Sequence, residues 1–491
     1  MMPFFTNRPL KKDKTPCWFA GLHVTACCRR LEAALIGIHG YGTDCLVEIG
    51  HGLAIDLPPE FRLDIETAAH QDRDNAHGKK GHGKGLSQHG RDAAPFLQTC
   101  AAENVLQAPS LKTRAALLAI QEETIRELLT SGGVAPSELL AIGVHDPGLW
   151  SADIPADTFP ETYNDKDVDS SPRIGDISYS RKKFRDNKPG STFYAPLSDT
   201  AGLAARTGHN VLEALPVTDL STGGQGGPLF PLAYWAILHS NERHRLLLDL
   251  GQDTRITFLP NSLHGNKSQI GYGFAGACGS LIDPIVQALT SNEQKHDDGG
   301  RLSVQGTLLP ELQESLARWG EQNASTLPLH WSPFSGVFGA EQAKSILEAA
   351  RRKNWPLRDV LCTVVEAIAC RIARALRVQF GPILAGSEVL LAGGGRRHGD
   401  LVRKLKRELA GTKFLPLESL KVNPETLDAS ALAVLTSLTI NQVPGNLPHL
   451  TGAETDRVLG RLIPGSPQNW QKLIRAMSEA QPTMRTLRGT F

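Results

Sequence analysis

A carboxylate stands shortly before a glycine-rich turn near the middle of the 491-residue sequence, where Asp219 is followed by Gly223, Gly224, Gln225 and Gly226. Glycines let a backbone approach a ligand closely, and a neighbouring carboxylate can accept a proton from water. Asp219 is therefore a candidate general base. Aspartate is also favoured as a cap of helices and turns, so a purely structural role stays open.

Two further candidate residues or turns, one polar and one glycine-rich, follow directly after apolar runs. The run 140–144 ends at His145, and the run 388–392 ends at Gly393, Gly394 and Gly395. Sites in open α/β sheets form at the carboxyl ends of strands, which makes the loop at His145 a candidate site. A satisfied histidine at a strand end is an equally good interpretation of His145. A triple glycine alone is a weak signal.

Short apolar runs alternate with helical periodicities, which predicts an α/β architecture with at least partly parallel sheets. Three runs near the N-terminus predict a meander of strands at 17–24, 31–38 and 45–53. Ser110 can cap a helix that Gly132 and Gly133 would end. The second half predicts paired strands at 244–250 and 254–259, and helices at 281–289, 309–319, 360–378 and 401–409.

The composition is that of a globular protein, with 41% hydrophobic and 21% charged residues. Its 52 basic and 51 acidic residues nearly cancel, so no basic field attracts nucleic acid or an anionic membrane. We find neither a secretory signal nor an apolar stretch of about eighteen residues, and we expect a cytoplasmic protein. The eight cysteines include no C-x-x-C pair, so they predict reduced thiols and no metal site.

Two polar stretches interrupt this pattern, and we expect both to be solvated insertions. The stretch 151–191 is rich in Asp, Lys, Pro and Ser. The stretch 70–92 carries four histidines, His70, His77, His82 and His89. A metal site there is an open alternative, but ligands on a flexible loop lack the fixed surroundings that make a site selective.

Three segments together resemble the anhydro-N-acetylmuramic acid kinase family. Residues 219–229 (DLSTGGQGGPL) resemble that family's D-x-x-x-G-G-Q-G-A-P-L, and residues 444–453 (PGNLPHLTGA) resemble its P-G-N-L-P-x-V-T-G-A. Residues 392–395 (AGGG) are similar to its S-G-G-G turn, and residues 428–433 (DASALA) to its E-A-x-A-F-A helix. The resemblance runs from about residue 19 to residue 453, interrupted by the two polar stretches.

The resemblance implies a two-lobed, actin-like ATPase or sugar kinase fold of the α/β class. Family members use ATP and Mg²⁺ to phosphorylate 1,6-anhydro-N-acetylmuramic acid on oxygen 6 while water opens the anhydro ring. The product is N-acetylmuramic acid 6-phosphate, formed during cell-wall recycling. On this basis Asp219 is the general base on the water, and the amino sugar contacts His145, Gly223, Gly224, Gln225 and Gly226. Family members commonly form dimers, so a homodimer is expected.

The family's phosphate-binding segments are altered in this sequence. The family's G-L-M-S-G-T-S-x-D-G-I-D-A-A-L aligns with residues 21–35, where Thr25 replaces a loop glycine and Arg29 replaces an aspartate near the metal. D-T-G-P-G-N becomes FAGACG at 274–279, and N-I-G-G-I-A-N becomes DLGQDTR at 249–255. By position, the nucleotide contacts would be Thr25, Arg29, Gly251, Gly276, Gly393, Gly394 and Gly395.

These replacements bear on the chemistry of phosphate binding. A phosphate cradle needs bare backbone amides, which the lost glycines should spoil. Arg29 can grip a phosphate but cannot ligate Mg²⁺. Two functions therefore stay open: an active sugar kinase, or a pseudokinase that binds an amino sugar, a nucleotide or a protein partner without turnover. A structural scaffold is a third, weaker alternative.

The resemblance also predicts a division of the chain. We expect a disordered tail at 1–16, a first lobe at 17–222 with insertions near 70–92 and 151–191, a second lobe at 223–423, a helix returning to the first lobe at 424–460, and an extension at 461–491.

Overall fold

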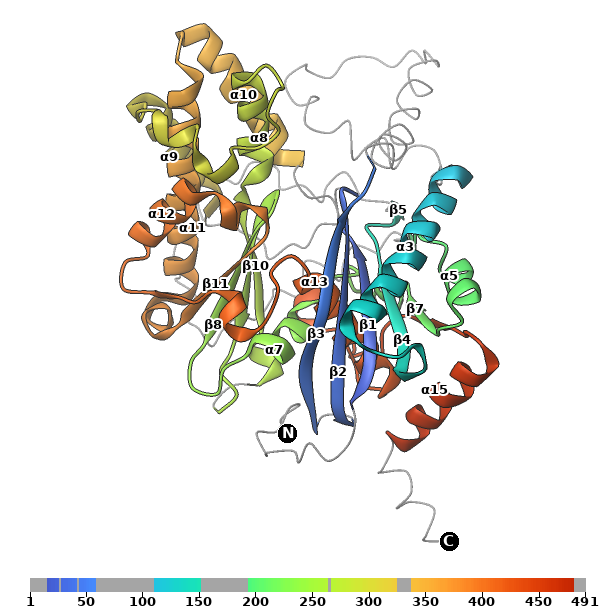
Figure 1. Ribbon diagram of the computed structural model, residues 1–491. Coiled ribbons are helices and arrows are strands. Elements are labelled where there is room, and N and C mark those ends of the chain that lie inside the picture. Colours follow the sequence, from blue (N-terminus) through green and yellow to red (C-terminus); the bar gives the residue numbers. More distant parts are fainter. Residues whose placement is uncertain are drawn as a thin grey trace, which may run out of the picture.

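The computed structural model describes residues 16–25, 28–41, 44–58, 110–151, 193–263, 266–324 and 337–480. Apart from residues 16 and 151, the predicted tail and the two polar stretches lie outside these residues. The described chain forms two α/β lobes that stand next to each other, each built on its own sheet (Figure 1). The division into segments 1–16, 17–222, 223–423, 424–460 and 461–491 stays a prediction.

The first sheet has the strand order β13-β7-β4-β1-β2-β3. Strands β1, β2 and β3 form the predicted antiparallel meander, and β4 and β7 continue it in parallel from β1. The bounds of the six strands are β1 (Cys17–Val24), β2 (Arg30–Tyr41), β3 (Asp44–Asp56), β4 (Leu139–His145), β7 (Val211–Glu213) and β13 (Arg461–Ile463). A separate antiparallel pair is formed by β5 (Leu149–Ser151) and β6 (Phe193–Ala195).

The second sheet repeats this arrangement, with the order β10-β9-β8-β11-β12. Again the first three strands in sequence are antiparallel neighbours, and the next two continue in parallel from the first. Its strands are β8 (Arg245–Leu250), β9 (Asp253–Leu259), β10 (Gly271–Ala277), β11 (Glu388–Ala392) and β12 (Lys413–Phe414). Two lobes with one shared strand order confirm the expected actin-like α/β fold.

Helix α3 (Leu111–Gly132) confirms the prediction made from its caps. The Ser110 hydroxyl accepts a hydrogen bond from the Thr113 amide over 3.2 Å. At the other end Gly133 has φ +65°, a left-handed conformation that favours glycine, and its amide reaches back to the last turn. The helix then packs against β2 and β3.

The remaining helices pack on the sheets or on one another, and four of them confirm helices expected in the second half. They are α5 (Thr200–Thr207), α6 (Leu215–Leu220), α7 (Pro231–Leu238), α8 (Gly279–Leu289), α9 (Pro310–Ala324), α10 (Val337–Lys353), α11 (Leu357–Gly386), α12 (Gly399–Glu408), α13 (Leu427–Ile440), α14 (Pro448–Thr451) and α15 (Pro467–Glu479). Helix α11 extends beyond the predicted end at residue 378. The extension follows a break at Gly381, which has φ +37° and precedes Pro382.

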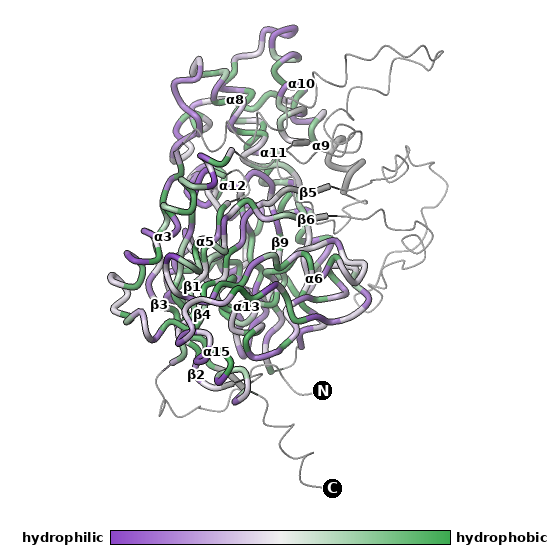
Figure 2. The backbone as a smooth tube through the Cα atoms, turned by 90° about the vertical axis from the view of Figure 1, so that its right-hand side faces the viewer, coloured by the Kyte–Doolittle hydropathy of each residue, from purple (hydrophilic) through white to green (hydrophobic). Residues whose placement is uncertain are grey.

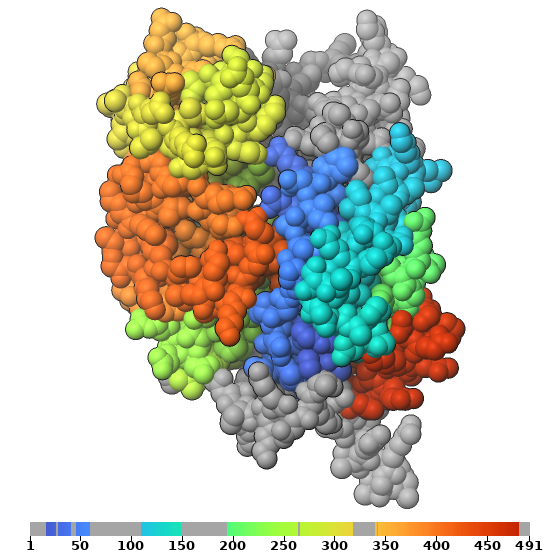
Figure 3. All heavy atoms as spheres, viewed as in Figure 1, coloured from blue at the N-terminus to red at the C-terminus, as the bar shows by residue number. Residues whose placement is uncertain are grey.

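Helix α13 lies between the lobes, and nearly all of its residues are buried. It packs directly on β1, β2 and β4, and a Cβ atom on Gly21 of β1 would collide with the backbone of Ala429. An apolar cluster extends from the first sheet through α7 and α13 to the second sheet. In Figure 2 hydrophobic segments gather around β1, β4 and α13, and Figure 3 shows the surfaces of the two lobes in contact.

Among the described residues, no helix combines the length and the apolar character needed to cross a membrane.

Candidate functional site

Several of the sequence-predicted residues lie at the carboxyl ends of parallel strands in the two lobes. Thr25 follows β1 and His145 ends β4 in the first lobe, while Gly251 follows β8 and Gly393 follows β11 in the second. An ion-pair bridge joins these ends, because Glu425 accepts hydrogen bonds from both Arg30, on β2, and Arg396, in the turn after β11. The two strand edges therefore face one shared region.

A row of polar side chains crosses the first sheet within this region. His23 of β1 lies opposite His145 of β4 and opposite Glu32 of β2 in the strand register. The two imidazole rings stack with centroids 5.8 Å apart, and Phe230 packs edge-on against both. Burial, with a smaller contribution from His23, lowers the pKa of His145 to about 3, so this imidazole is neutral at physiological pH.

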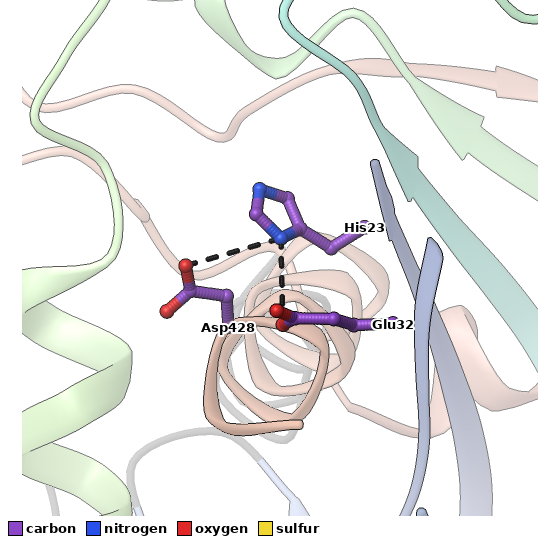
Figure 4. A group of neighbouring side chains, drawn as sticks. All are labelled: His23, Glu32 and Asp428. Carbon is purple, nitrogen blue, oxygen red and sulfur yellow. Dashed lines mark ion pairs between the residues drawn. The ribbon is translucent and has the colours of Figure 1, made fainter. Parts of the chain in front are cut away.

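His23, Glu32 and Asp428 converge on one point (Figure 4). His23 Nδ1 lies 3.6 Å from Glu32 Oε2 and 3.8 Å from Asp428 Oδ2. Asp428 stands in the first turn of α13, and its other oxygen accepts a 2.5 Å hydrogen bond from the Tyr234 hydroxyl. The sequence analysis missed this cluster. A usable signal existed, since Glu32 and Asp428 stand where the family patterns have an aspartate and a glutamate.

The second lobe contributes further charges to the same region. Burial raises the pKa of Asp249 to about 6 against the opposing effect of Arg255, and burial raises the pKa of Glu32 to about 7 against that of His23. Burial would lower the pKa of His23, but Glu32 and Asp428 raise it overall. Carboxyl groups with pKa values near neutrality can both take up and release protons. The region can thus support acid–base chemistry.

Asp219 lies in a different cluster, where it ties two segments together. Its side chain is fully buried, and its Oδ1 accepts hydrogen bonds from Asn446 Nδ2 (2.8 Å) and Thr451 Oγ1 (2.7 Å). Its Oδ2 accepts one from the Gly226 amide (2.9 Å). The contacts of Asp219 are those of a structural tie, and its role as general base stays a prediction.

The glycine-rich turn after Asp219 also connects these two segments. A Cβ on Gly224 would collide with the Asp219 carboxylate, while Gly223 has φ +77° and open space around it. The Gln225 amide donates to the Thr451 carbonyl over 2.9 Å. These contacts bind segment 223–226 to segment 446–451, and the predicted sugar contacts of Gly223, Gly224, Gln225 and Gly226 stay predictions.

Comparison with known proteins identifies the family. The profile of a family described as anhydro-N-acetylmuramic acid kinase matches residues 184–465, more than half of the chain. The chain belongs to the anhydro-N-acetylmuramic acid kinase family.

Curated anhydro-N-acetylmuramic acid kinases from several bacteria are similar to the chain. The one from Gloeobacter violaceus is 32% identical over 57% of this chain and 69% of its own length. The one from Synechococcus elongatus is 31% identical over 53% of this chain and 68% of its own length. The one from Nitrosomonas europaea is 26% identical over 72% of this chain and 84% of its own length.

Solved structures are more distant. The activator of 2-hydroxyisocaproyl-CoA dehydratase from Clostridium difficile with bound ADPNP is 12% identical, with a TM-score of 0.35 over 86% of this chain and 94% of that one. A ROK family glucokinase from Streptomyces griseus in complex with glucose and AMPPNP is 10% identical, with a TM-score of 0.31 over 85% and 98% of the two chains.

In the first phosphate segment typical of the anhydro-N-acetylmuramic acid kinase family, the described residues on either side of positions 26 and 27 hydrogen-bond to one another. The Thr25 amide donates to the Arg30 carbonyl (3.0 Å), and the Cys28 amide donates to the Thr25 carbonyl (2.8 Å). The Thr25 hydroxyl accepts from the Arg30 amide (3.2 Å). Arg29 lies in this turn, half-buried, and its carbonyl accepts from the Leu57 amide. These three amides are therefore engaged before any phosphate arrives.

The second phosphate segment is hydrogen-bonded in a similar way. The amides of Cys278 and Ser280 donate to the Gln252 carbonyl over 2.8 and 3.0 Å, and the Gly279 amide donates to the Gly251 carbonyl over 3.0 Å. Gly276 has φ +92°, and a Cβ there would lie 2.7 Å from the Arg371 guanidinium carbon. The glycines at 251 and 276 thus serve contacts within the protein.

The triple glycine turn packs on the end of β8. A Cβ on Gly393 would collide with Asp249 Oδ1, and one on Gly395 would lie 2.8 Å from the Leu250 carbonyl oxygen. Gly394 faces open space. Phe274 lies opposite Arg255 in the β9–β10 register, and Arg29 stands where the family pattern has an acid, so neither side chain offers Mg²⁺ an oxygen ligand at these positions.

Proposed function

We propose that this member of the anhydro-N-acetylmuramic acid kinase family binds a 1,6-anhydro amino sugar between its lobes without efficient phosphoryl transfer. One observation carries the proposal: in and beside the two predicted phosphate segments, described backbone amides already donate to carbonyl groups within the protein, from Thr25 to Arg30, from Gly279 to Gly251, and from Cys278 and Ser280 to Gln252. Phosphoryl transfer depends almost entirely on positioning and electrostatic stabilisation, so a closed cradle removes most of the catalytic effect.

Sugar binding makes different demands on a site. Sugars are recognised by a few fixed polar groups among apolar and aromatic ones. Groups of this kind that support the proposal are His145, with Phe230 packed against it, and Arg255 and Tyr272 on β9 and β10 of the second sheet. N-acetylmuramic acid carries a carboxylate. Burial would lower the pKa of Arg255, but the surrounding Tyr272, Asp249 and Asp428 raise it, so Arg255 stays a cation, and we expect the sugar carboxylate to bind there.

The second candidate function is ATP-dependent phosphorylation of 1,6-anhydro-N-acetylmuramic acid, the activity named for the curated relatives. The family match over residues 184–465 favours it, as does Asp249, a carboxyl group whose pKa of about 6 suits a proton acceptor. ATP and Mg²⁺ would be required, and Asp219 would be the predicted base. A cytoplasmic location and a homodimer belong to both candidates.

A turnover assay separates the two functions. The purified protein is incubated with ATP, Mg²⁺ and 1,6-anhydro-N-acetylmuramic acid, and the product is followed by mass spectrometry. The relative from Gloeobacter violaceus is assayed in parallel as a positive control. We expect product from the relative and none from this chain. Product formation that is abolished by Asp219→Asn or Asp249→Asn would establish the kinase instead.

A binding assay tests the sugar site directly. A ligand that binds only the folded state must raise the melting temperature, so thermal unfolding is measured with the sugar alone and with ATP alone. We expect a shift with the sugar that is reduced in Arg255→Gln and retained in Arg243→Gln, a matched change at an exposed position. The absence of any shift with the sugar at millimolar concentration would overturn the binding proposal.

A further inference from the structure

We propose that His23, Glu32 and Asp428 form a binding site for one divalent transition-metal ion, such as Zn²⁺ or Mn²⁺. This site goes beyond the sugar-binding function and does not depend on it. It uses an imidazole and two carboxylates, a set of nitrogen and oxygen donors that binds such ions well. Mg²⁺ prefers oxygen ligands alone and keeps much of its water, so the site differs in kind from one built for a magnesium nucleotide.

The geometry of the three donors already approaches what a metal ion requires. Metal–ligand distances of about 2.0–2.2 Å place the donor atoms of a tetrahedral site about 3.3–3.6 Å apart. The distances from His23 Nδ1 are 3.6 Å to Glu32 Oε2 and 3.8 Å to Asp428 Oδ2. The three donor atoms all lie within 4.8 Å of one another, so side-chain rotation would bring them around one ion, with water as the fourth ligand of a tetrahedral site.

The nitrogen of His23 points to a missing ligand. His23 is 8% exposed, and its Nδ1 has no hydrogen-bond partner among the described residues, although it is aimed between the two carboxylates (Figure 4). A buried polar atom without a partner is costly, and native proteins rarely leave one. A bound cation would give this nitrogen its partner.

The elements around the site hold the donors in place from three directions. His23 and Glu32 are direct cross-strand neighbours on β1 and β2, and Asp428 projects from the start of the buried helix α13. Tyr234 of α7 donates to Asp428 Oδ1 over 2.5 Å, leaving Oδ2 for the metal. Outer hydrogen bonds of this kind orient ligands in metal sites. Asp428 keeps a 30% exposed side chain, which gives an ion a path of entry.

The local charge favours a dication. Glu32, Asp428 and the neighbouring Asp249 are three carboxylates. Arg255 interacts with Asp249, Asp428 and His23, and Arg30 interacts with Glu32 but also pairs with Asp56 and Glu425. Ionised carboxylates in excess of cations are expensive to bury, and a divalent ion would compensate the remaining negative charge.

A second group of potential ligands shows the contrast. Glu366, Cys370 and Glu408 also come close enough to hold an ion. There, however, Glu366 already pairs with Arg407 and Lys404, and Arg407 also pairs with Glu408. Protein cations thus occupy the place that a metal ion would take, and that group carries no proposal.

The test measures metal content and affinity of the full chain. Purified protein is stripped with a chelator, dialysed against Zn²⁺ or Mn²⁺, and analysed by elemental mass spectrometry and titration calorimetry. The histidines at 70, 77, 82 and 89 could bind metal independently, so a variant with all four replaced by glutamine is measured alongside. We expect this variant to retain one tightly bound ion, even in the presence of excess Mg²⁺.

Substitutions within the four-glutamine background then locate the ion. His23→Asn and the isosteric Glu32→Gln should each abolish tight binding. Tyr234→Phe removes an orienting hydrogen bond and should weaken binding about 10-fold to 100-fold. His39→Gln is the matched control, because His39 is equally buried but pairs with the single carboxylate of Glu48 at 2.7 Å, and it should leave binding unchanged.

X-ray absorption on the metal-loaded four-glutamine variant gives a readout that needs no ligand substitution. We expect a first shell of nitrogen and oxygen donors with the scattering pattern of one imidazole. Loss of all tight binding when the four histidines are replaced, or an unchanged affinity in a folded His23→Asn variant, would overturn the proposal. A first shell without imidazole would overturn it as well.

Discussion

Replacing Asp219 by asparagine distinguishes a structural tie from a catalytic base. The substitution keeps the size of the side chain but turns one carboxylate oxygen into an NH₂ group. Oδ1 accepts from Asn446 and Thr451, and Oδ2 accepts from the Gly226 amide. An asparagine side chain can accept either from Asn446 and Thr451 or from the Gly226 amide, but not from all three donors. Its NH₂ group therefore faces at least one of these donors.

The expected magnitude follows from these three bonds. A hydrogen bond to a charged group contributes about 1.5–3 kcal/mol, and a buried donor left without a partner costs about 1–3 kcal/mol. Because Asp219 is fully buried, water cannot replace the lost partner. We expect Asp219→Asn to lower the free energy of unfolding by about 3 kcal/mol.

The assay is urea unfolding followed by both circular dichroism and tryptophan fluorescence. Coincident transitions are needed for a single free energy to be defined in a chain of this size. Asp199→Asn is the matched control: Asp199 caps α5 through one bond to the Gly202 amide, and asparagine caps about as well as aspartate. We expect the control to change stability by less than about 0.5 kcal/mol.

Two outcomes separate the roles of Asp219. A large loss of stability in Asp219→Asn, shared by Thr451→Val and non-additive in the double variant, supports the tie. If Asp219→Asn were as stable as the wild type while a measurable kinase activity disappeared, the structural reasoning would be refuted, and Asp219 would act as the base that the resemblance implies.

Two further predictions concern the second lobe. Gly393→Ala should destabilise the protein by more than about 1 kcal/mol, because Gly393 has φ +75° and a Cβ there would collide with Asp249. Gly394→Ala is the control and should not destabilise the protein, because a Cβ at Gly394 would meet open space. Thermal unfolding of both variants checks this prediction. Burial would raise the pKa of Asp297, but hydrogen bonds from His398 and from the Leu302 and Ser303 amides hold it at about 2. A folded pKa below the ordinary 3.8 stabilises the protein above about pH 4, and this stabilisation, about 2 kcal/mol, is lost as the pH falls toward 2. The difference in unfolding free energy between wild type and Asp297→Asn should therefore shrink on acidification, and a constant difference from about pH 6 to about pH 3 would contradict the assignment.

Local sequence signals predicted the secondary structure because the forces that produce it act over a few residues. Ser110 and Gly133 mark the ends of α3 since a hydroxyl cap and a left-handed glycine are short-range features. The apolar run of β1 was similarly readable. The continuation of α11 past Gly381 was not, because a glycine followed by a proline is a local signal for the end of a helix.

The candidate site was only partly predictable. The strand-end positions of Thr25, His145 and Gly251 follow from the alternation of strands and helices, and the structure confirms that they lie at strand ends. His23, Glu32 and Asp428 were missed. They meet through the register of two strands and through a helix that begins about 400 residues later in the chain, and no local pattern encodes such a meeting.

Taken alone, the order of residues determined the family, the two α/β lobes and the positions where phosphate-binding glycines have been replaced, because these depend on local patterns and on motifs long enough to be specific. Tertiary structure decided which donors and acceptors meet. Only the folded chain shows that Asp219 is held by Asn446 and Thr451, that loop amides are already paired, and that His23 faces two carboxylates. Hydrogen bonds and ion pairs form between groups a few ångströms apart in space, and the number of residues between two groups in the chain does not tell how far apart they lie in the fold.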